Sequence, residues 1–124
     1  MRSILLVGLG GFIGSIARYL IAAIIQNKST SIFPIGTLMV NIVGCLLIGL
    51  FLGLSDKQNI ISPELRLFLT IGFCGGFTTF SSFTNDNVQL INSGALLQVL
   101  LYTGLSVIVG IAATYIGFLI VKAF

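Results

Sequence analysis

Apolar residues fill most of this chain in four long runs, which short polar stretches separate. The runs cover residues 3–25, 35–54, 65–90 and 95–121. A helix that crosses a bilayer needs about 20 predominantly apolar residues, so each run is long enough to span a membrane. The pattern predicts an all-α membrane protein that forms a single transmembrane domain over residues 1–124, with four membrane-spanning helices.

The polar stretches contain residues that begin or end helices. Pro34 stands just before the second run, where proline is well tolerated. Residues 55–64 are expected to form a loop, and Asn92-Ser93-Gly94 is a typical turn sequence. A cleaved signal peptide is not expected, because the first run continues beyond Ser15-Ile16-Ala17.

The third run differs from the others because glycines and hydroxyl side chains interrupt it. Gly75 and Gly76 are followed by alternating hydroxyls and phenylalanines, Thr78-Thr79-Phe80-Ser81-Ser82-Phe83. Glycine weakens a helix, and backbone groups freed at membrane depth persist only where they are buried in protein or line a wet cavity. We therefore expect this helix to be broken mid-membrane near residues 75–78, and the break to belong to an ion pathway.

Phe80 and Phe83 are one helical turn apart, so their rings should project from one face. A phenyl ring has a positive edge that can approach an anion without supplying a fixed charge. The expected break would also turn the carbonyl oxygens of Gly75 and Thr78 toward a common point, and hard cations such as Na⁺ take oxygen ligands. The segment thus suits an anion path beside a Na⁺ held by backbone carbonyls.

Polar side chains within the other runs each have two interpretations. Arg18 either extends to the lipid headgroups or bonds to backbone carbonyls inside the protein. Asn41 either ties two helices together or lines a pore with its amide donors. The fourth run carries a stripe that packing and a hydrophilic track explain equally well: Thr103, Ser106, Gly110 and Thr114.

Composition places the chain in a lipid bilayer. Its residues are 56% hydrophobic and only 7% charged, and its mean hydropathy is +1.15. Soluble domains carry about 25% charged residues, so this chain has too few to cover a water-facing surface. The formal net charge of +3 is small and scattered, which argues against nucleic acid as a partner.

Positive side chains favour a cytoplasmic N-terminus, but only weakly. With that orientation four positive side chains lie inside, Arg2, Lys57, Arg66 and Lys122, and Lys28 lies outside. Arg18, near the end of the first run, favours the reverse orientation. A bias of this size permits insertion in both orientations.

The residues do not indicate an enzyme. The sequence has no His and three acidic residues, which leaves no nucleophile–base pair and no metal-ligand cluster. Cys45 and Cys74 both lie in apolar runs without a C-x-x-C pair, so we expect them to be packing residues.

Gly8, Gly10 and Gly14 imitate a dinucleotide-binding turn, but that fingerprint needs an acid about 20 residues further on. The first acid in this chain is Asp56. Gly10 and Gly14 are instead a small-xxx-small pair that lets two helices pack closely in lipid.

Two other functions fit four apolar runs. A small dual-topology multidrug transporter needs a membrane-embedded carboxylate to exchange protons for a cationic drug. The first run has no acid, and Asp86 lies near the end of the third. A non-transporting membrane assembly subunit would use the glycine stripes for packing alone, which leaves the alternating hydroxyls and phenylalanines unexplained.

Three segments resemble the Fluc (CrcB-type) family of fluoride channels, and the likeness extends over all four runs in order. The segments are Gly10-Gly11-x-x-Gly14-x-x-x-Arg18-Tyr19, Pro34-x-Gly36-Thr37-Leu38-x-Val40-Asn41-x-x-Gly44 and Gly72-Phe73-Cys74-Gly75-Gly76-x-Thr78-Thr79-Phe80-Ser81-Ser82-Phe83. Thr84 and Asp86 stand where the family commonly has Ser and Glu, and each keeps the functional group. The fourth run matches less well, and only Thr114 aligns comfortably.

The resemblance implies a plasma-membrane channel that exports fluoride by passive electrodiffusion and protects a bacterial cell from fluoride toxicity. It also implies an antiparallel, dual-topology homodimer with a structural Na⁺ at its centre on the carbonyls of Gly75 and Thr78. The weak charge bias fits such a dimer, because its two copies insert in opposite orientations. The ion-pathway residues that the resemblance implies are Arg18, Asn41, Phe80, Ser81, Ser82, Phe83, Thr84 and Thr114.

Overall fold

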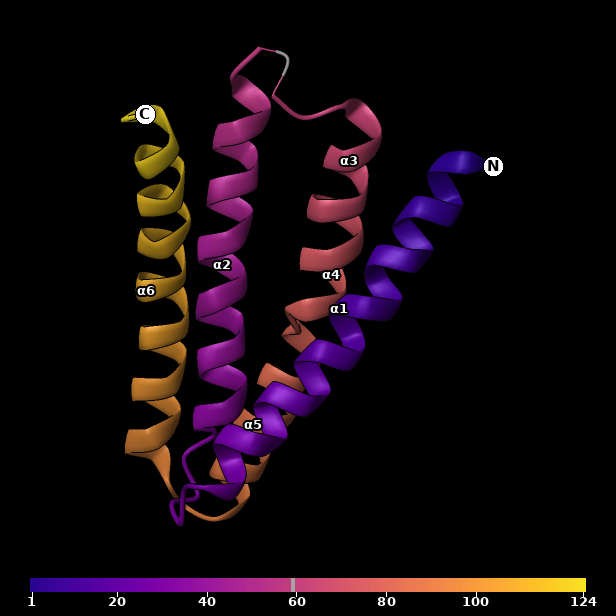
Figure 1. Ribbon diagram of the computed structural model, residues 1–124. Coiled ribbons are helices and arrows are strands. Elements are labelled where there is room, and N and C mark those ends of the chain that lie inside the picture. The colour runs from indigo at the N-terminus through magenta and orange to yellow at the C-terminus, as the bar shows by residue number, and fades with distance from the viewer. Residues whose placement is uncertain (59) are drawn as a thin grey trace.

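The computed structural model describes residues 1–58 and 60–124, and its regular elements there are all helical (Figure 1). Residue 59, inside the loop expected over 55–64, lies outside the described residues. In chain order the elements are α1 (Arg2–Asn27), α2 (Ile35–Asp56), α3 (Pro63–Leu67), the π-helix η1 (Phe68–Cys74), α4 (Gly75–Phe77), α5 (Phe80–Asn92) and α6 (Leu96–Lys122).

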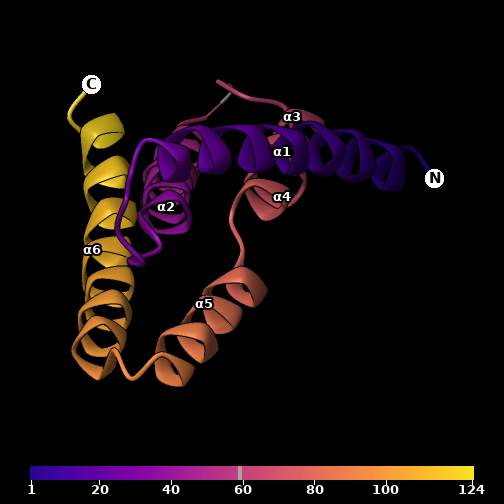
Figure 2. The same ribbon diagram turned by 90° about the horizontal axis from the view of Figure 1, so that it is seen from below.

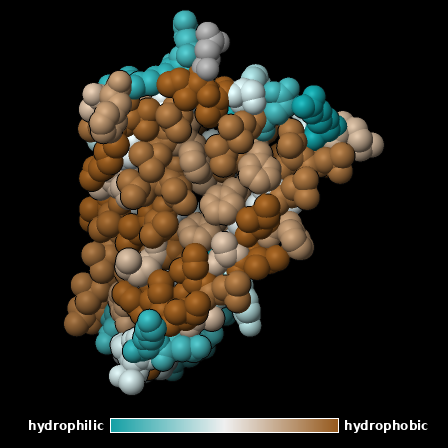
Figure 3. All heavy atoms as spheres, in the orientation of Figure 1, coloured by the Kyte–Doolittle hydropathy of each residue, from teal (hydrophilic) through white to brown (hydrophobic). Residues whose placement is uncertain are grey.

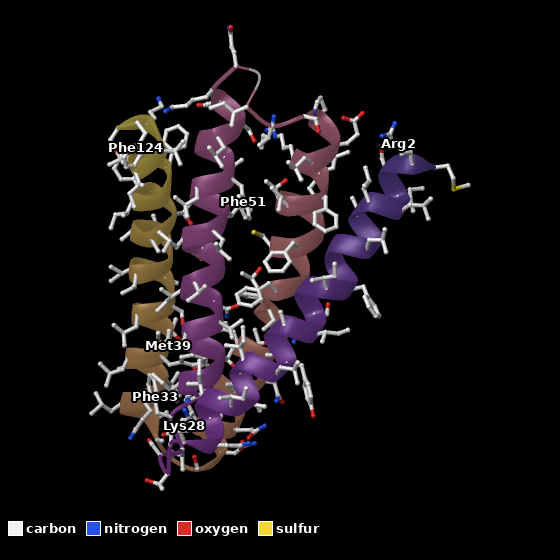
Figure 4. All side chains as sticks on the ribbon, in the orientation of Figure 1. Arg2, Lys28, Phe33, Met39, Phe51 and Phe124 are labelled. Carbon is white, nitrogen blue, oxygen red and sulfur yellow. The ribbon has the colours of Figure 1, made fainter. Side chains whose placement is uncertain are left out.

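Four helical stretches of the described chain are long and apolar enough to cross a membrane: α1, α2, the stretch Pro63–Asn92 and α6. Apolar side chains cover the middle of the molecule's visible face, and hydrophilic ones gather at its two ends (Figure 3). Arg2 and Phe124 lie at one end, and Lys28 and Phe33 lie at the other (Figure 4). This distribution confirms the expected four membrane-length helices.

Glycines bring α2 and α6 into close contact, and the two helices run side by side in Figure 1. A Cβ atom added to Gly117 of α6 would lie 2.5 Å from the carbonyl oxygen of Leu46, and one added to Gly49 would meet the Thr114 carbonyl. Neither position has room for a larger residue, so the backbones of the two helices touch directly.

Helix α1 crosses the third helical stretch in the same manner. A Cβ added to Gly10 would lie 2.5 Å from the Phe68 carbonyl oxygen, and one added to Gly14 would meet Phe73. The predicted close helix packing at this glycine pair is therefore confirmed. A Cβ at Gly76 would lie 2.5 Å from the carbonyl oxygen of Gly11, so the approach is close from both sides.

The third stretch departs from the expected geometry in two respects. The sequence places an interruption near residues 75–78, but Gly75 and Gly76 are helical, and the extended backbone is at Thr78 (φ −86°, ψ 156°) and Thr79 (φ −149°, ψ 119°). Gly76 is needed for its contact with Gly11 rather than for a bend. The π-helical winding of η1 was not foreseen. We call Thr78 and Thr79 the extended segment; beyond it α5 runs at an angle to α4 (Figure 2).

The buried interior near the turn between α5 and α6 is aromatic and aliphatic. Leu38, Leu90 and Tyr102 form its core, and Phe33 and Phe83 pack against them. Cys45 and Cys74 are both free thiols, and Cys74 is fully buried. This core holds α5 against α2 and α6 and so positions the residues on the first turn of α5.

Candidate functional site

Asn41 of α2 holds the extended segment through two hydrogen bonds. Its Nδ2 donates to the carbonyl oxygen of Thr79 (3.1 Å), and its Oδ1 accepts from the Thr79 backbone N–H (2.8 Å). An extended residue inside a membrane-length helix leaves its backbone groups without helical partners, and such groups are costly when they are buried unpaired. The Asn41 amide satisfies both groups of Thr79, so it does tie two helices together.

Arg18 of α1 reaches the same region. Its Nε–H donates to the Gly76 carbonyl oxygen over 3.0 Å, and the side chain is half-buried. Of the two interpretations of Arg18, the structure therefore supports the one in which the side chain bonds to a backbone carbonyl inside the protein. The guanidinium places a positive charge beside the extended segment.

Thr79 also begins α5. Its Oγ1 accepts from the backbone N–H of Ser82 (3.1 Å) and lies 3.2 Å from the Ser82 hydroxyl, so Thr79 is the N-cap residue of the helix. Ser81 lies 3.4 Å from the same oxygen, and Thr84 donates to the Ser81 carbonyl (2.9 Å). Four hydroxyls are thus grouped around the first turn of α5.

The two phenylalanines of α5 belong to a continuous series of rings. The ring centroids of Phe80 and Phe83 are 5.6 Å apart, and Phe83 lies 5.0 Å from Tyr102, which is 5.7 Å from Phe33. Phe80 is 76% exposed, whereas Tyr102 is completely buried. The series therefore runs from the surface of the chain into its interior.

A cavity of about 380 Å³, here called the main cavity, lies where these elements meet. It collects the predicted anion-path residues Asn41, Phe80 and Phe83 together with the predicted cation-site residues Gly75 and Thr78. The rest of its wall is formed by Gly44, Cys45, Ile48, Thr70, Cys74, Thr79, Ser106 and Val107. The wall is mostly apolar, with an amide and several hydroxyls at separate points.

The other predicted site residues lie outside the main cavity. Arg18 and Ser82 line a second cavity of about 300 Å³, and Thr79 lines both cavities. Thr114 lines a third cavity of about 830 Å³, whose wall is formed by residues of α2 and α6 and by Arg66 of α3. The Thr114 hydroxyl donates to the Cys45 carbonyl over 3.0 Å. Ser81 and Thr84 are exposed on α5.

Two features of the site escaped the sequence reasoning. The hydroxyl of Ser106 lines the main cavity, is buried, and has no hydrogen-bond partner among the described residues. The sequence shows that Ser106 belongs to the hydroxyl stripe of the fourth run, but it does not show whether that stripe faces a cavity or a neighbouring helix. Tyr102 donates its hydroxyl to Asp86 over 2.9 Å. The signal for this pair was a tyrosine within an apolar run, since a buried tyrosine hydroxyl needs a partner.

The described side chains do not form a cluster of the usual metal ligands in this region. Among residues 1–58 and 60–124, no three His, Cys, Asp or Glu side chains are grouped closely enough to hold a metal ion. A cation in the main cavity would therefore have to use backbone carbonyl and hydroxyl oxygens, which are suitable ligands for a hard cation.

Helices of membrane length around an open, mostly apolar cavity that carries an amide, hydroxyls and phenyl rings define a small polytopic membrane protein. Residues 5–118 match the family model described as CrcB-like protein, Camphor Resistance (CrcB). The match covers nearly the whole chain, and the chain belongs to this family.

Curated relatives extend the match over almost every residue. A protein of Flavobacterium psychrophilum is 48% identical over 122 residues, 98% of each chain. One of Azobacteroides pseudotrichonymphae is 41% identical over 124 residues, 100% of this chain and 99% of its own. One of Phocaeicola vulgatus is 47% identical over 117 residues, 94% of this chain and 96% of its own. Each of the three is named fluoride-specific ion channel FluC. The chain is a multi-pass protein of the bacterial plasma membrane.

Proposed function

We propose that this protein is a fluoride-selective ion channel that exports fluoride from the cytoplasm by passive electrodiffusion and so protects the cell from fluoride toxicity. The observation that carries the proposal is the wall of the main cavity, where Asn41, Phe80 and Phe83 surround one space. The name shared by the relatives supports fluoride as the ion.

Asn41 is suited to hold the extended segment and to meet an anion at once. Its amide has two N–H donors, and the hydrogen bond to Thr79 engages one of them. The other N–H belongs to a side chain that lines the main cavity. The two interpretations of Asn41 are therefore compatible, and we assign it both roles.

The phenyl rings and Ser106 would replace part of the water that the ion sheds. Phe80 and Phe83 are tilted by 36° relative to one another, which suits the approach of ring edges to an ion from more than one side. Ser106 has a buried hydroxyl with no hydrogen-bond partner among the described residues, and an anion in the cavity would accept a hydrogen bond from it. Such weak and separate contacts permit both entry and release.

The second cavity would continue the path on the other side of Thr79. Arg18 and Ser82 line it, so an anion there would meet a fixed positive charge and a hydroxyl. Ser81 lies next to Thr79 on the same helical turn. We place these three residues on the path at the end that the second cavity opens.

Thr84 and Thr114 have weaker support as pathway residues. A hydroxyl has a single proton to donate. The Thr84 hydroxyl donates its hydrogen bond to the Ser81 carbonyl, and the Thr114 hydroxyl donates its hydrogen bond to the Cys45 carbonyl. Each side chain must release that bond before it can donate to an anion, so we assign them at most a secondary role.

We further propose that the working unit is an antiparallel homodimer with the third helix broken at membrane depth. Phe80 is 76% exposed and Gly75 is exposed, yet both line the main cavity. The cavity is thus open on the side where these residues lie, and a second copy would close it. Inverted insertion agrees with a visible face that is apolar in the middle and hydrophilic at both ends (Figure 3).

A structural Na⁺ at the dimer centre fits the residues present. Gly75 and Thr78 both line the main cavity, and their carbonyl oxygens would hold the ion with those of the second copy. When bound, Na⁺ would supply a fixed positive charge near the anion path. The chain's own part is to keep those carbonyl oxygens free of helical hydrogen bonds.

An interior-negative membrane supplies the drive. A membrane potential acts on a monovalent ion with about 2.3 kcal/mol per 100 mV, and its sign drives an anion outward. Neither ATP nor a coupled proton is required.

Fluoride release from liposomes tests the function directly. Purified protein is reconstituted in liposomes that contain potassium fluoride, with sodium on both sides, and a fluoride electrode follows release after valinomycin is added. We expect release without a pH gradient, no release from protein-free liposomes, and retention of chloride in matched potassium chloride liposomes.

The assay separates the alternatives. Movement of a cationic drug only under a pH gradient would identify a multidrug transporter instead, and absence of any flux would favour an assembly subunit. In cells, the chain should restore growth in fluoride medium to a strain that lacks its own fluoride exporter.

A further inference from the structure

We infer that Asn41 and Thr79 are positioning residues for the cation site, because their side chains remove the two N–H donors that would otherwise occupy the Gly75 and Thr78 carbonyls. The inference rests on the proposed function, which places Na⁺ on those two carbonyls. The hydrogen bonds of Asn41 to the extended segment and of Thr79 at the start of α5 would thereby have a role in ion binding as well as in holding the fold.

The first carbonyl is freed by Asn41. In an α-helix the backbone N–H of a residue donates to the carbonyl four residues earlier, so the Thr79 N–H would donate to Gly75. In this structure the Thr79 N–H donates to Asn41 Oδ1 at 2.8 Å. The reciprocal bond from Asn41 Nδ2 to the Thr79 carbonyl (3.1 Å) holds the amide in this orientation.

The second carbonyl is freed by Thr79 itself. The helical donor for the Thr78 carbonyl is the Ser82 N–H, and this group donates to the Thr79 Oγ1 at 3.1 Å. The N-cap of α5 therefore does more than begin a helix. It prevents the first turn of α5 from closing on Thr78, a residue that lines the main cavity.

A neighbouring carbonyl shows the opposite arrangement. Gly76 lies one residue after Gly75, and its oxygen is occupied by the Arg18 Nε–H at 3.0 Å. The Gly76 carbonyl thus accepts a hydrogen bond from a side chain of α1, whereas the N–H groups that would donate to the Gly75 and Thr78 carbonyls in a helix donate to side chains instead. The two freed carbonyls belong to residues that line the main cavity.

Four substitutions separate the donor-removing contacts from other effects. Asn41→Gln keeps an amide that can both accept from the Thr79 N–H and donate to the Thr79 carbonyl, whereas Asn41→Leu removes it. Thr79→Ser keeps the hydroxyl that accepts from the Ser82 N–H, and Thr79→Val removes it at nearly constant shape. The measured quantity is Na⁺ bound to purified full-length protein, followed with ²²Na⁺ against increasing unlabelled sodium.

We expect Asn41→Leu and Thr79→Val to weaken Na⁺ binding by about tenfold or more, the effect of about one competing hydrogen bond. Asn41→Gln and Thr79→Ser should bind Na⁺ within about threefold of the original chain by the same scale. Equal Na⁺ affinity in all five proteins would overturn the inference. Size-exclusion elution and helical circular dichroism identify any variant that fails to fold.

A second measurement needs no variant. Thr78-Thr79 is the only Thr-Thr pair in the chain, and Gly75-Gly76 is one of two Gly-Gly pairs, the other being Gly10-Gly11. Cell-free synthesis with ¹³C-carbonyl and ¹⁵N labels on threonine, and separately on glycine, therefore gives resolved carbonyl signals for Thr78 and Gly75. Sodium should shift both signals, while Gly10 serves as an unaffected reference.

The outcomes separate this inference from the proposed function. If sodium shifts neither carbonyl signal while the original chain still releases fluoride from liposomes, the inference is wrong and the channel function stands. If Na⁺ binds as expected but no fluoride is released, the channel proposal is wrong and the roles of Asn41 and Thr79 in cation binding stand.

Discussion

Arg18 donates its Nε–H to the carbonyl oxygen of Gly76 over 3.0 Å, although 58 positions separate the two residues in the sequence. The bond joins α1 to α4 immediately before the extended segment. Close approach of the two helices makes it possible, since a Cβ added to Gly76 would lie 2.5 Å from the carbonyl oxygen of Gly11. A charged side chain within a membrane helix is thereby paired with a backbone group instead of facing lipid.

Replacing Arg18 with Leu should lower the free energy of unfolding by about 1–3 kcal/mol, because the Gly76 carbonyl loses its donor in a half-buried setting. Unfolding in mixed micelles, followed by circular dichroism, measures the change. Arg2→Leu is the matched control, since Arg2 is exposed at the first turn of α1. Equal losses in the two variants would mean that the bond to Gly76 contributes nothing.

Phe80→Ile and Phe83→Ile should each reduce fluoride release by about tenfold or more, because isoleucine is apolar but has no positive ring edge to meet an anion. Phe80 is 76% exposed, so its replacement should leave the fold of one chain intact. The liposome assay measures the rate. Phe124→Ile, at an exposed chain end, should release fluoride at the original rate, and unchanged release from both α5 variants would remove the rings from the mechanism.

Tyr102→Phe should lower the free energy of unfolding by about 1–3 kcal/mol, because it removes the hydroxyl that donates a hydrogen bond to Asp86 over 2.9 Å. The ring contacts with Phe33 and Phe83 are retained in this variant, so packing stays the same. Asp86→Asn keeps an acceptor oxygen and should cost less. The two stabilities are compared by thermal unfolding in detergent, and a larger loss for Asp86→Asn would contradict this account.

Gly49→Ala should destabilise the protein by about 1–3 kcal/mol, because the added methyl group would collide with the Thr114 backbone carbonyl on α6. Gly104→Ala is the matched control on α6, where an added Cβ meets nothing within 4 Å. Alanine is the better helix former, so this control should be neutral or stabilised by up to about 1 kcal/mol. Thermal unfolding of the two variants tests the difference; similar melting temperatures would exclude direct backbone contact between α2 and α6.

The sequence predicted the membrane helices well because their cause is local. A backbone in hydrocarbon must pair its own polar groups, so a long apolar run has few alternatives to a helix. The pair Gly10 and Gly14 was also interpretable, since close helix packing in lipid depends on small residues at this spacing. The lining of the main cavity could be predicted only in part. The spacing of Phe80 and Phe83 predicts that their rings share one face, whereas the sequence around Ser106 does not indicate the direction of its side chain.

Long-range partners could not be derived from the sequence. Asn41 and Thr79 are 38 positions apart, and neither residue type reveals that one will hold the backbone of the other. The glycines at 75 and 76 suggested a bend, but tertiary packing used Gly76 for its contact with α1, and the extended backbone fell at Thr78 and Thr79.

The sequence by itself thus determined a four-helix membrane protein, and the residue types at its polar site, because hydrophobicity and side-chain chemistry are properties of each segment alone. Only the tertiary structure decided which donors meet which carbonyls, since a hydrogen bond depends on distances of about 3 Å between helices that the chain order does not specify. That choice is what leaves the Gly75 and Thr78 oxygens without their helical donors.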